Sequence, residues 1–200
     1  MKLFCESADL KDYLDELEEV DYSHPLIQEK VREIQAAHHS PLERVRIAYE
    51  FVRDKIDHSW DIQSTRVTCK ASEVLQYGEG ICYAKSHLLA ALLRAQGIPT
   101  GFCYQRLTRG DTPDTGYAVH ALNAFYLDTV DKWVRLDARG NKPGVQAEFS
   151  IDEEKLAFPV RPEMDEIDYP VIYAKPQTSH VLKKHTNALE MYQYHLPKRL

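Results

Sequence analysis

The segment that follows Cys82 constrains the fold more than any other part of the chain. Four leucines recur along it with alanines between them, at Leu88, Leu89, Leu92 and Leu93. A helix that is apolar on nearly every side is stable only when other elements cover it. We therefore expect a central, buried helix that begins near Cys82 and ends before Gly97 and Pro99.

The residues before this helix predict further helices. Residues 1–20 are charge-rich with apolar residues at helical spacing, which indicates a short helix at the edge of the core, and residues 25–37 indicate a second. In the third, Ser40 suits the N-cap, Pro41 suits the first turn, and Glu43 completes a capping box. The third helix has a core-facing side made of Leu42, Val45, Tyr49, Val52 and Ile56.

Shorter helical segments are expected at three other places. Residues 71–78, "ASEVLQYG", predict one or two turns capped by Ser72 and ended by Gly78. Residues 150–156, "SIDEEKL", look like a capped helix start with acidic residues in the first turn. Residues 180–192 predict a C-terminal helix docked on the core.

From Gly101 the apolar pattern changes from helical to strand-like. Residues 101–107 ("GFCYQRL"), 119–127 ("VHALNAFYL") and 132–139 ("KWVRLDAR") are rich in aromatic and β-branched side chains. A polar loop, "TRGDTPDTG", joins the first two runs, and the short "DTVDK" suits a hairpin between the last two. Helices followed by an antiparallel meander predict an α+β fold with a helix packed on a sheet.

A single domain over residues 1–200 accommodates all of these elements. Its core is expected at about residues 40–142, preceded by the helices of residues 1–39. Beyond Gly144 the chain is acidic and punctuated by prolines, so residues 143–200 are interpreted as a segment that docks on the core.

Composition narrows the class of partner. The chain has 200 residues and a net charge of −6, which gives no electrostatic reason to expect nucleic acid or an anionic membrane. The first residues are acidic and lack a sustained apolar run, so no signal peptide is expected, and no run reaches the length of a membrane span. A cytoplasmic location is expected, with four widely spaced cysteines kept reduced: Cys5, Cys69, Cys82 and Cys103.

Cys82 stands at the mouth of the central helix, just behind Gly78 and Gly80. The free N–H groups and the dipole at a helix start stabilise a thiolate, which is the nucleophilic form of cysteine. The same N–H groups can point at an oxyanion that forms beside the sulfur. An inert buried cysteine that follows a glycine loop is the alternative interpretation.

A histidine and an aspartate are placed to complete a catalytic set. His120 lies in the strand-like run 119–127, on the same strand face as Leu122, Ala124 and Tyr126, and we expect this face to meet the helix. Asp137 lies near the end of the next run. A hairpin brings the start of its first strand beside the end of its second, so the carboxylate can orient the imidazole. A satisfied core histidine remains the alternative.

These residues resemble the core of the transglutaminase-like superfamily. The resemblance rests on "GEGICYAKSHLLAALLRAQGIPT", "HALNAFYL" and "WVRLDARG" in that order, and extends from about Arg44 to about Asn141. It implies a papain-like α+β core of the bacterial, stand-alone type. It also implies Cys82 as nucleophile, His120 as general base and acid, and Asp137 as the residue that orients His120.

The chain departs from the family pattern in two respects. The family usually has Ala-Trp after the histidine, whereas Ala121 is followed here by Leu122, which favours a changed substrate pocket over a lost triad. Family members also use an upstream side chain to hold the oxyanion, and "DKIDHSWD" offers His58 and Trp60. Gly80 and Tyr83, which flank the cysteine, are further oxyanion or substrate candidates.

The chemistry implied is acyl transfer or hydrolysis at a peptide or small amide through a Cys82 thioester, with no cofactor and no metal. Hydrolysis is favoured over transfer to an amine, and the sequence leaves the oligomeric state open. Two alternatives remain: a non-catalytic binding module that keeps the fold, and an arylamine N-acetyltransferase-like enzyme, which is expected to be longer.

Other residue groups give weaker evidence of function. The glycines of "YGEGI" follow no predicted strand and lack the third glycine of a dinucleotide loop. His24, His38 and His39 are interpreted as solvent-exposed rather than metal-binding, because adjacent histidines diverge. Cys69 is expected to be inert rather than to form a regulatory disulfide with Cys82.

Overall fold

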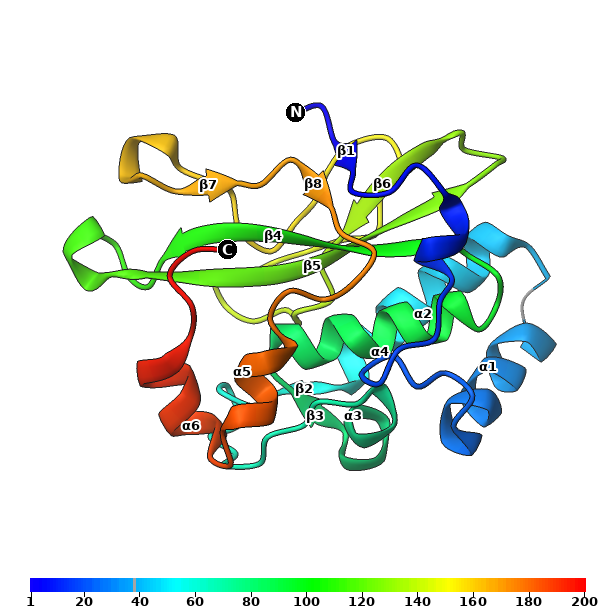
Figure 1. Ribbon diagram of the computed structural model, residues 1–200, viewed down its shortest axis with the longest axis horizontal. Helices are drawn as coiled ribbons and strands as arrows, with labels where there is room; N and C mark the ends of the chain where they lie inside the picture. The colour runs from blue at the N-terminus through cyan, green and yellow to red at the C-terminus, as the bar shows by residue number, and fades with distance from the viewer. Residues whose placement is uncertain (38) are drawn as a thin grey trace.

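The computed structural model describes residues 1–37 and 39–200 and has an α+β architecture (Figure 1). The α-helices are α1 (Pro25–Ala37), α2 (Pro41–Lys55), α3 (Ala71–Tyr77), α4 (Cys82–Arg94), α5 (Ser179–Lys184) and α6 (Ala188–Glu190), and a π-helical turn η4 (Met191–His195) follows. The 3₁₀ turns are η1 (Leu10–Tyr13), η2 (Pro113–Thr115) and η3 (Pro162–Met164). The strands are β1 (Phe4–Cys5), β2 (Asp57–His58), β3 (Glu79–Gly80), β4 (Thr100–Thr108), β5 (Tyr117–Leu127), β6 (Lys132–Leu136), β7 (Ile167–Asp168) and β8 (Val171–Ile172).

The main sheet is antiparallel, with the strand order β6-β5-β4-β7. The three long strands confirm the predicted meander, and the β5–β6 hairpin turns between Leu127 and Lys132 as expected. Its innermost pair joins Leu127 to Lys132 and its last pair joins Asn123 to Leu136. β6 therefore ends one residue before Asp137, opposite Asn123, which lies three residues after His120 in β5.

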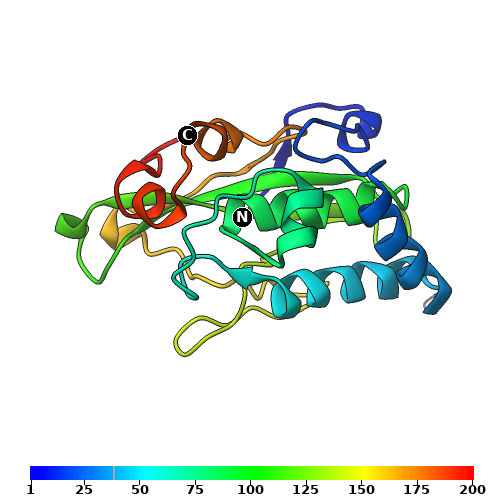
Figure 2. The same cartoon turned by 90° about the horizontal axis from the view of Figure 1, so that it is seen from below.

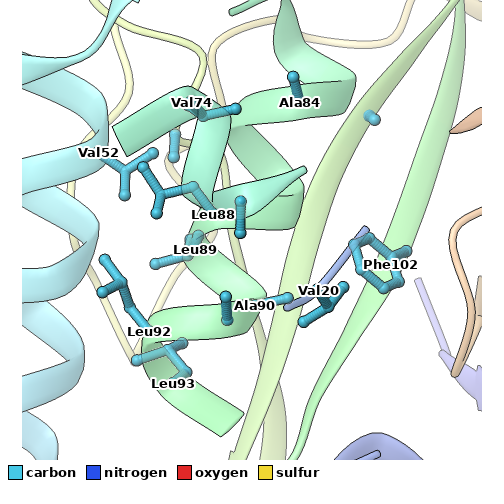
Figure 3. Packing of buried hydrophobic residues seen from close by; sticks show 14 of the residues in the cluster. Val20, Val52, Val74, Ala84, Leu88, Leu89, Ala90, Leu92, Leu93 and Phe102 are labelled. Atoms are coloured by element: carbon cyan, nitrogen blue, oxygen red, sulfur yellow. The ribbon is translucent and has the colours of Figure 1, made fainter. Parts of the chain in front are cut away.

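Helix α4 is the central element that the sequence predicts, and all of its residues are buried. Its leucines pack among Val52 of α2, Val74 of α3 and Phe102 of β4 (Figure 3). Seen from below, α4 lies between α2 on one side and α5 on the other (Figure 2). Such all-round cover explains why the helix needs no polar face. Burial of apolar surface stabilises a fold by roughly 25 cal/mol per Å², so this fully buried helix contributes strongly to stability.

The two faces of β5 pack into different hydrophobic clusters. Val119, Ala121 and Phe125 pack in the main core with α4, whereas Leu122 and Ala124 pack in a second cluster with Tyr13 and Cys103. The expectation that the face of His120, Leu122 and Ala124 meets the helix is therefore wrong. His120 lies near the start of the strand and Cys82 at the start of the helix, and both residues line the same cavity.

Helices α1 and α2 have the predicted bounds, and most of the predicted core face of α2 is buried. The predicted capping box is wrong, because Ser40 is the N-cap of α2 but its side chain makes no capping hydrogen bond. Pro41 has no N–H to offer, so part of the usual need for a cap is already removed. The predicted helix within residues 1–20 is only the 3₁₀ turn η1, which buries Tyr13.

Helix α3 is capped differently from the prediction. Its N-cap is Lys70, and the carboxylate of Glu73 accepts hydrogen bonds from the N–H groups of Cys69 (2.9 Å) and Lys70 (3.1 Å). Ser72 is instead inside the helix, where its hydroxyl donates to Asp21 at 2.5 Å. Gly78 ends the helix in the left-handed region, with a φ of 69°, as predicted.

Two of the C-terminal predictions are wrong. Residues 150–156 form no helix but a bend at 151–153 and irregular chain, in which Glu154 pairs with Arg135, whose Nε lies 2.7 Å from Oε1 of Glu154. The single helix predicted over residues 180–192 is instead the separate α5 and α6, since Asn187 starts a new helix by accepting the N–H groups of Leu189 and Glu190.

Within the described part of the chain, no helix is long and apolar enough to cross a membrane. His24 and His39 are exposed, and the expectation for His38 lies outside the described residues. All four cysteines are free thiols.

Candidate active site

The loop before Cys82 is held against the segment that follows α2. β2 and β3 pair in parallel, with Asp57 opposite Glu79 and His58 opposite Gly80. The N–H of Ser59 extends this ladder by donating to the carbonyl of Gly80 at 3.3 Å. The pairing brings the predicted oxyanion segment alongside the turn from which the nucleophile emerges.

Gly80 packs tightly at the base of this turn. A side chain there would place its Cβ 3.0 Å from Cβ of Ala84 and 3.0 Å from Oγ1 of Thr68. Thr68 in turn donates to the carbonyl of Glu79 at 3.0 Å. The glycine is needed for close approach of the loop to α4.

Cys82 is the first residue of α4, with Ile81 as the N-cap, and only 6% of the residue is exposed. The N–H of the first helical residue has no acceptor within the helix, so it is available to a ligand. Tyr83, the next residue, points into the core, where its hydroxyl donates to the carbonyl of Val119 at 2.7 Å. That bond ties the start of α4 to the residue before His120.

His120 and Asp137 are joined directly. The imidazole Nε2 lies 2.8 Å from Oδ2 of Asp137, and both residues are buried. The carboxylate also accepts the N–H groups of Arg139 and Ala157, each at 3.1 Å. Because Asp137 occupies Nε2, Nδ1 is the ring nitrogen left for the Cys82 thiol. The ring of Phe158 meets the imidazole edge-on, with centroids 5.1 Å apart.

The electrostatics favour a charged imidazole. Burial alone would lower the pKa of His120, but the charges of Asp137 and Cys82 outweigh it and raise the pKa well above its ordinary value. For Asp137, burial works toward a higher pKa, and the charge of His120 with the three hydrogen bonds overcomes this and lowers the pKa. The Asp137 carboxylate is thus ionised and stabilises an imidazolium at His120.

Cys82 and His120 line a cavity of about 550 Å³. Its other walls come from the β4–β5 connection, the loop after Asp137, the segment before β7 and the C-terminal segment. The described residues that line it include His58, Trp60, Cys82, Thr108, Arg109, Asp111, Val119, His120, Arg139, Lys142, Val145, Phe158, Arg161, Glu166, Tyr192 and Leu196.

An aromatic group forms one side of the cavity. The ring of Tyr192 stacks on Trp60, with centroids 4.7 Å apart, and meets His58 edge-on at 5.7 Å. His58 is only 4% exposed, and its Nδ1 is buried with no hydrogen-bond partner. Burial first, and then the charge of Arg139, hold the pKa of His58 well below its ordinary value, so the ring is neutral and carries one N–H.

The C-terminal segment is fastened across the cavity. The N–H of Val119, the residue before His120, donates to the carbonyl of Pro197 at 2.8 Å. The guanidinium of Arg109 donates to the carbonyls of Tyr192 (2.9 Å) and Gln193. Figure 1 shows this segment running past the β4–β5 end of the sheet.

Two ion-pair groups also border the cavity. The carboxylate of Asp61 receives both Arg139, at 2.9 Å from its Nη2, and Lys142, at 2.6 Å. Although burial opposes it, these hydrogen bonds lower the pKa of Asp61 to about 2. On another wall, Glu166 pairs with Arg161 at 2.8 Å.

The structure brings Cys82, His120 and Asp137 together and sets His58 and Trp60 on the same cavity. Gly80 and Tyr83 are adjacent to the site but do not line the cavity. Within the described residues, no group of three or more histidine, cysteine or carboxylate side chains is arranged to hold a metal ion.

Several residues of the site escaped the sequence prediction. Arg139 follows Asp137 by two positions in "DARG", so its place at the same end of the sheet could have been inferred. Tyr192 lies far away in sequence and in a segment without a motif, and its stacking on Trp60 depends on the path of the C-terminal chain.

Comparison with known proteins identifies a family that the chain matches. The family model described as the transglutaminase-like superfamily matches residues 28–138. No curated protein matches the chain. A structure from Cytophaga hutchinsonii described as a "Putative Cysteine Protease" superimposes with a TM-score of 0.54 at 18% identity, covering 66% of this chain and 43% of that one. The periplasmic domain of TgpA from Pseudomonas aeruginosa gives a TM-score of 0.48 at 17% identity, with 66% and 48% coverage. The chain thus spans less than half the length of either protein.

Proposed function

The chain belongs to the transglutaminase-like superfamily, and we propose that it is a cysteine hydrolase that cleaves a peptide-like or small amide bond through a thioester on Cys82. The single observation that supports this most is the arrangement of Cys82, His120 and Asp137 at one cavity, with His120 Nε2 bound to the carboxylate. Because Nε2 is bound to Asp137, which fixes the ring, Nδ1 is the nitrogen that we propose pairs with the Cys82 thiol.

In the first step the Cys82 thiolate attacks the carbonyl carbon. A C–S bond forms while the carbonyl π electrons move to oxygen, which gives a tetrahedral oxyanion. The oxyanion then collapses, the C–N bond breaks, and the imidazolium of His120 gives its proton to the departing amine. The products are a free amine, a thioester on Cys82 and a neutral His120.

In the second step a water molecule replaces the amine. His120 accepts a proton from the water as its oxygen attacks the thioester carbon, and the C–S bond then breaks to release the acid and restore the thiolate–imidazolium pair. An amine that enters instead of water would give a new amide. We propose hydrolysis as the main route because charged and polar side chains line much of the cavity, which favours water.

The oxyanion in this scheme is held by two donors. One is the backbone N–H of Cys82, which has no acceptor within α4. The other is the neutral imidazole of His58, which lines the cavity with Cys82 and has a buried nitrogen without a partner. Trp60 is committed to stacking on Tyr192 and is proposed to shape the pocket.

The test is acylation by an activated ester. We expect p-nitrophenyl acetate to acetylate Cys82 in intact protein, as read by peptide mass spectrometry, and the adduct to turn over in water. Cys69 is an internal control, since burial raises the pKa of its thiol to about 12. The His120→Ala variant is expected to lose the reaction. Equal labelling of Cys69 and Cys82, or labelling of Cys82 that persists in the variant at the same rate, would favour a binding module.

A further inference from the structure

We propose that the cavity accepts an acyl donor that carries a carboxylate close to the reacting carbonyl, recognised by Lys142 together with Arg139. This inference rests on the proposed function, because it names the substrate class of the same site. It is drawn from the distribution of charge around the cavity.

The cavity is positive in an acidic protein. The whole chain has a net charge of −6. Among the described residues that line the cavity, the cations outnumber the carboxylates: Arg109, Arg139, Lys142 and Arg161 against Asp111 and Glu166. A concave site with one sign of charge concentrates ligands of the other sign.

The cations are not equivalent. Arg161 is neutralised by Glu166, with which it forms several hydrogen bonds, and both side chains also bond to Thr108. Arg139 and Lys142 instead share a single carboxylate, that of Asp61. This group of three charges therefore carries one uncompensated positive charge on the wall beside the nucleophile.

The surplus charge is accessible. The Lys142 side chain is 38% exposed, and one bond to Asp61 leaves its other ammonium protons free to donate. Arg139 is 4% exposed and is held against Asp61, so it supplies charge from a fixed position. A single surplus charge is matched by a monoanion such as a carboxylate, whereas a phosphate dianion would stay half uncompensated.

Two alkylating reagents of matched size test this directly. Iodoacetate and iodoacetamide both alkylate a thiolate by displacing iodide, and they differ in carrying a carboxylate or an amide. We measure the rate of each on Cys82 by peptide mass spectrometry and take their ratio, with glutathione as the reference thiol. The expected ratio for Cys82 exceeds that for glutathione and falls as salt is added.

The imidazolium of His120 also attracts anions, so variants are needed to distinguish its effect on the ratio from that of Lys142. Lys142→Glu is expected to lower the iodoacetate to iodoacetamide ratio by about three- to tenfold, the effect of one or two unit charges across a solvated cavity. Lys155→Glu is the matched control, because Lys155 is equally exposed but does not line the cavity. It is expected to leave the ratio unchanged.

Protection of Cys82 from iodoacetamide by short peptides shows whether the carboxylate belongs to an acidic side chain or to a chain terminus. The blocked peptides Ac-Ala-Glu-Ala-NH₂ and Ac-Ala-Ala-Ala-OH, with Ac-Ala-Gln-Ala-NH₂ as the neutral control, are tested for slowing iodoacetamide at Cys82. Greater protection by the first indicates an acidic side chain, and by the second a chain terminus. The proposal is overturned if Lys142→Glu leaves the ratio intact, or if neither acidic peptide protects better than the neutral one. A Cys82 that reacts with neither reagent would instead overturn the proposed function.

Discussion

The Nε2 atom of His120 lies 2.8 Å from Oδ2 of Asp137, at the point where the β5–β6 hairpin opens. Two backbone N–H groups complete the cage around the carboxylate, from Arg139 and from Ala157. The second comes from the C-terminal part of the chain, so that part helps to fix the carboxylate that orients the imidazole. The position of the imidazole is thereby set by the folding of two distant regions.

Asp137→Asn removes the charge from this cage while keeping its shape. We expect it to slow acetylation of Cys82 by roughly 10²- to 10⁴-fold, because the imidazolium loses its charged partner. The pH profile reports the cause: the Asp137 charge raises the pKa of His120, so in the variant the plateau of reactivity should end at lower pH. A variant with an unchanged pH profile would show that Asp137 has only a structural role.

Much of this site was predictable because it depends on local patterns. The density of leucine and alanine after Cys82 requires a buried helix, and the alternation around His120 requires a strand. The hairpin loop has only four residues, 128–131, which leaves little freedom in register and brings Asp137 close to His120. These constraints are short-range, because each depends on a pattern of neighbouring residues.

The parts that the sequence could not predict are set by long-range contacts. Glu154 leaves a helix-like motif because Arg135, far away in the chain, offers two nitrogens to its carboxylate. Tyr192 reaches Trp60 only because helix α5 ends at Lys184 and a new helix begins after Asn187. Neither contact leaves a periodic signal, since each depends on where another segment happens to fold.

His58 can be distinguished from Trp60 as the oxyanion donor by comparing two reactions. Acetylation by an ester passes through an oxyanion, whereas alkylation by iodoacetamide does not. We expect His58→Ala to slow acetylation of Cys82 by about 10²- to 10³-fold while changing alkylation little. Trp60→Phe keeps a ring to stack on Tyr192 but removes the indole N–H, and it should leave both rates near wild type. The reverse pattern would assign the oxyanion to Trp60.

Tyr192 lines the same cavity as Cys82, and we expect its ring to restrict access to the thiol. Its ring covers Trp60 and borders His58, so Tyr192→Ala should open the cavity and accelerate alkylation of Cys82 several-fold. Tyr194→Ala is the matched control, because Tyr194 lies in the same turn η4 but is 68% exposed and does not line the cavity. Equal acceleration in both variants would mean that the turn has loosened as a whole, which the circular dichroism melting curves would also reveal.

Lys85 makes stability depend on pH. It is buried in the second turn of α4, where its ammonium donates to the carbonyls of Arg53 and Ile56 at the end of α2. Burial first, and then the charge of Arg139, lower its pKa to about 7.

Between pH 7 and the ordinary lysine value of about 10.4, the unfolded chain therefore binds a proton that the folded chain does not, so this lysine makes stability rise with pH. Below pH 7 the lysine is charged in both states and the full cost of its burial is present. We expect the free energy of unfolding of wild type, relative to Lys85→Met, to increase by about 1 kcal/mol per pH unit between about pH 7.5 and 9.5. Urea denaturation at several pH values measures this difference, in which the titration of His120 cancels because both proteins contain it. Lys155→Met, an exposed site, should show no such slope, and a flat difference for Lys85→Met would mean that the buried amine keeps its proton throughout this range.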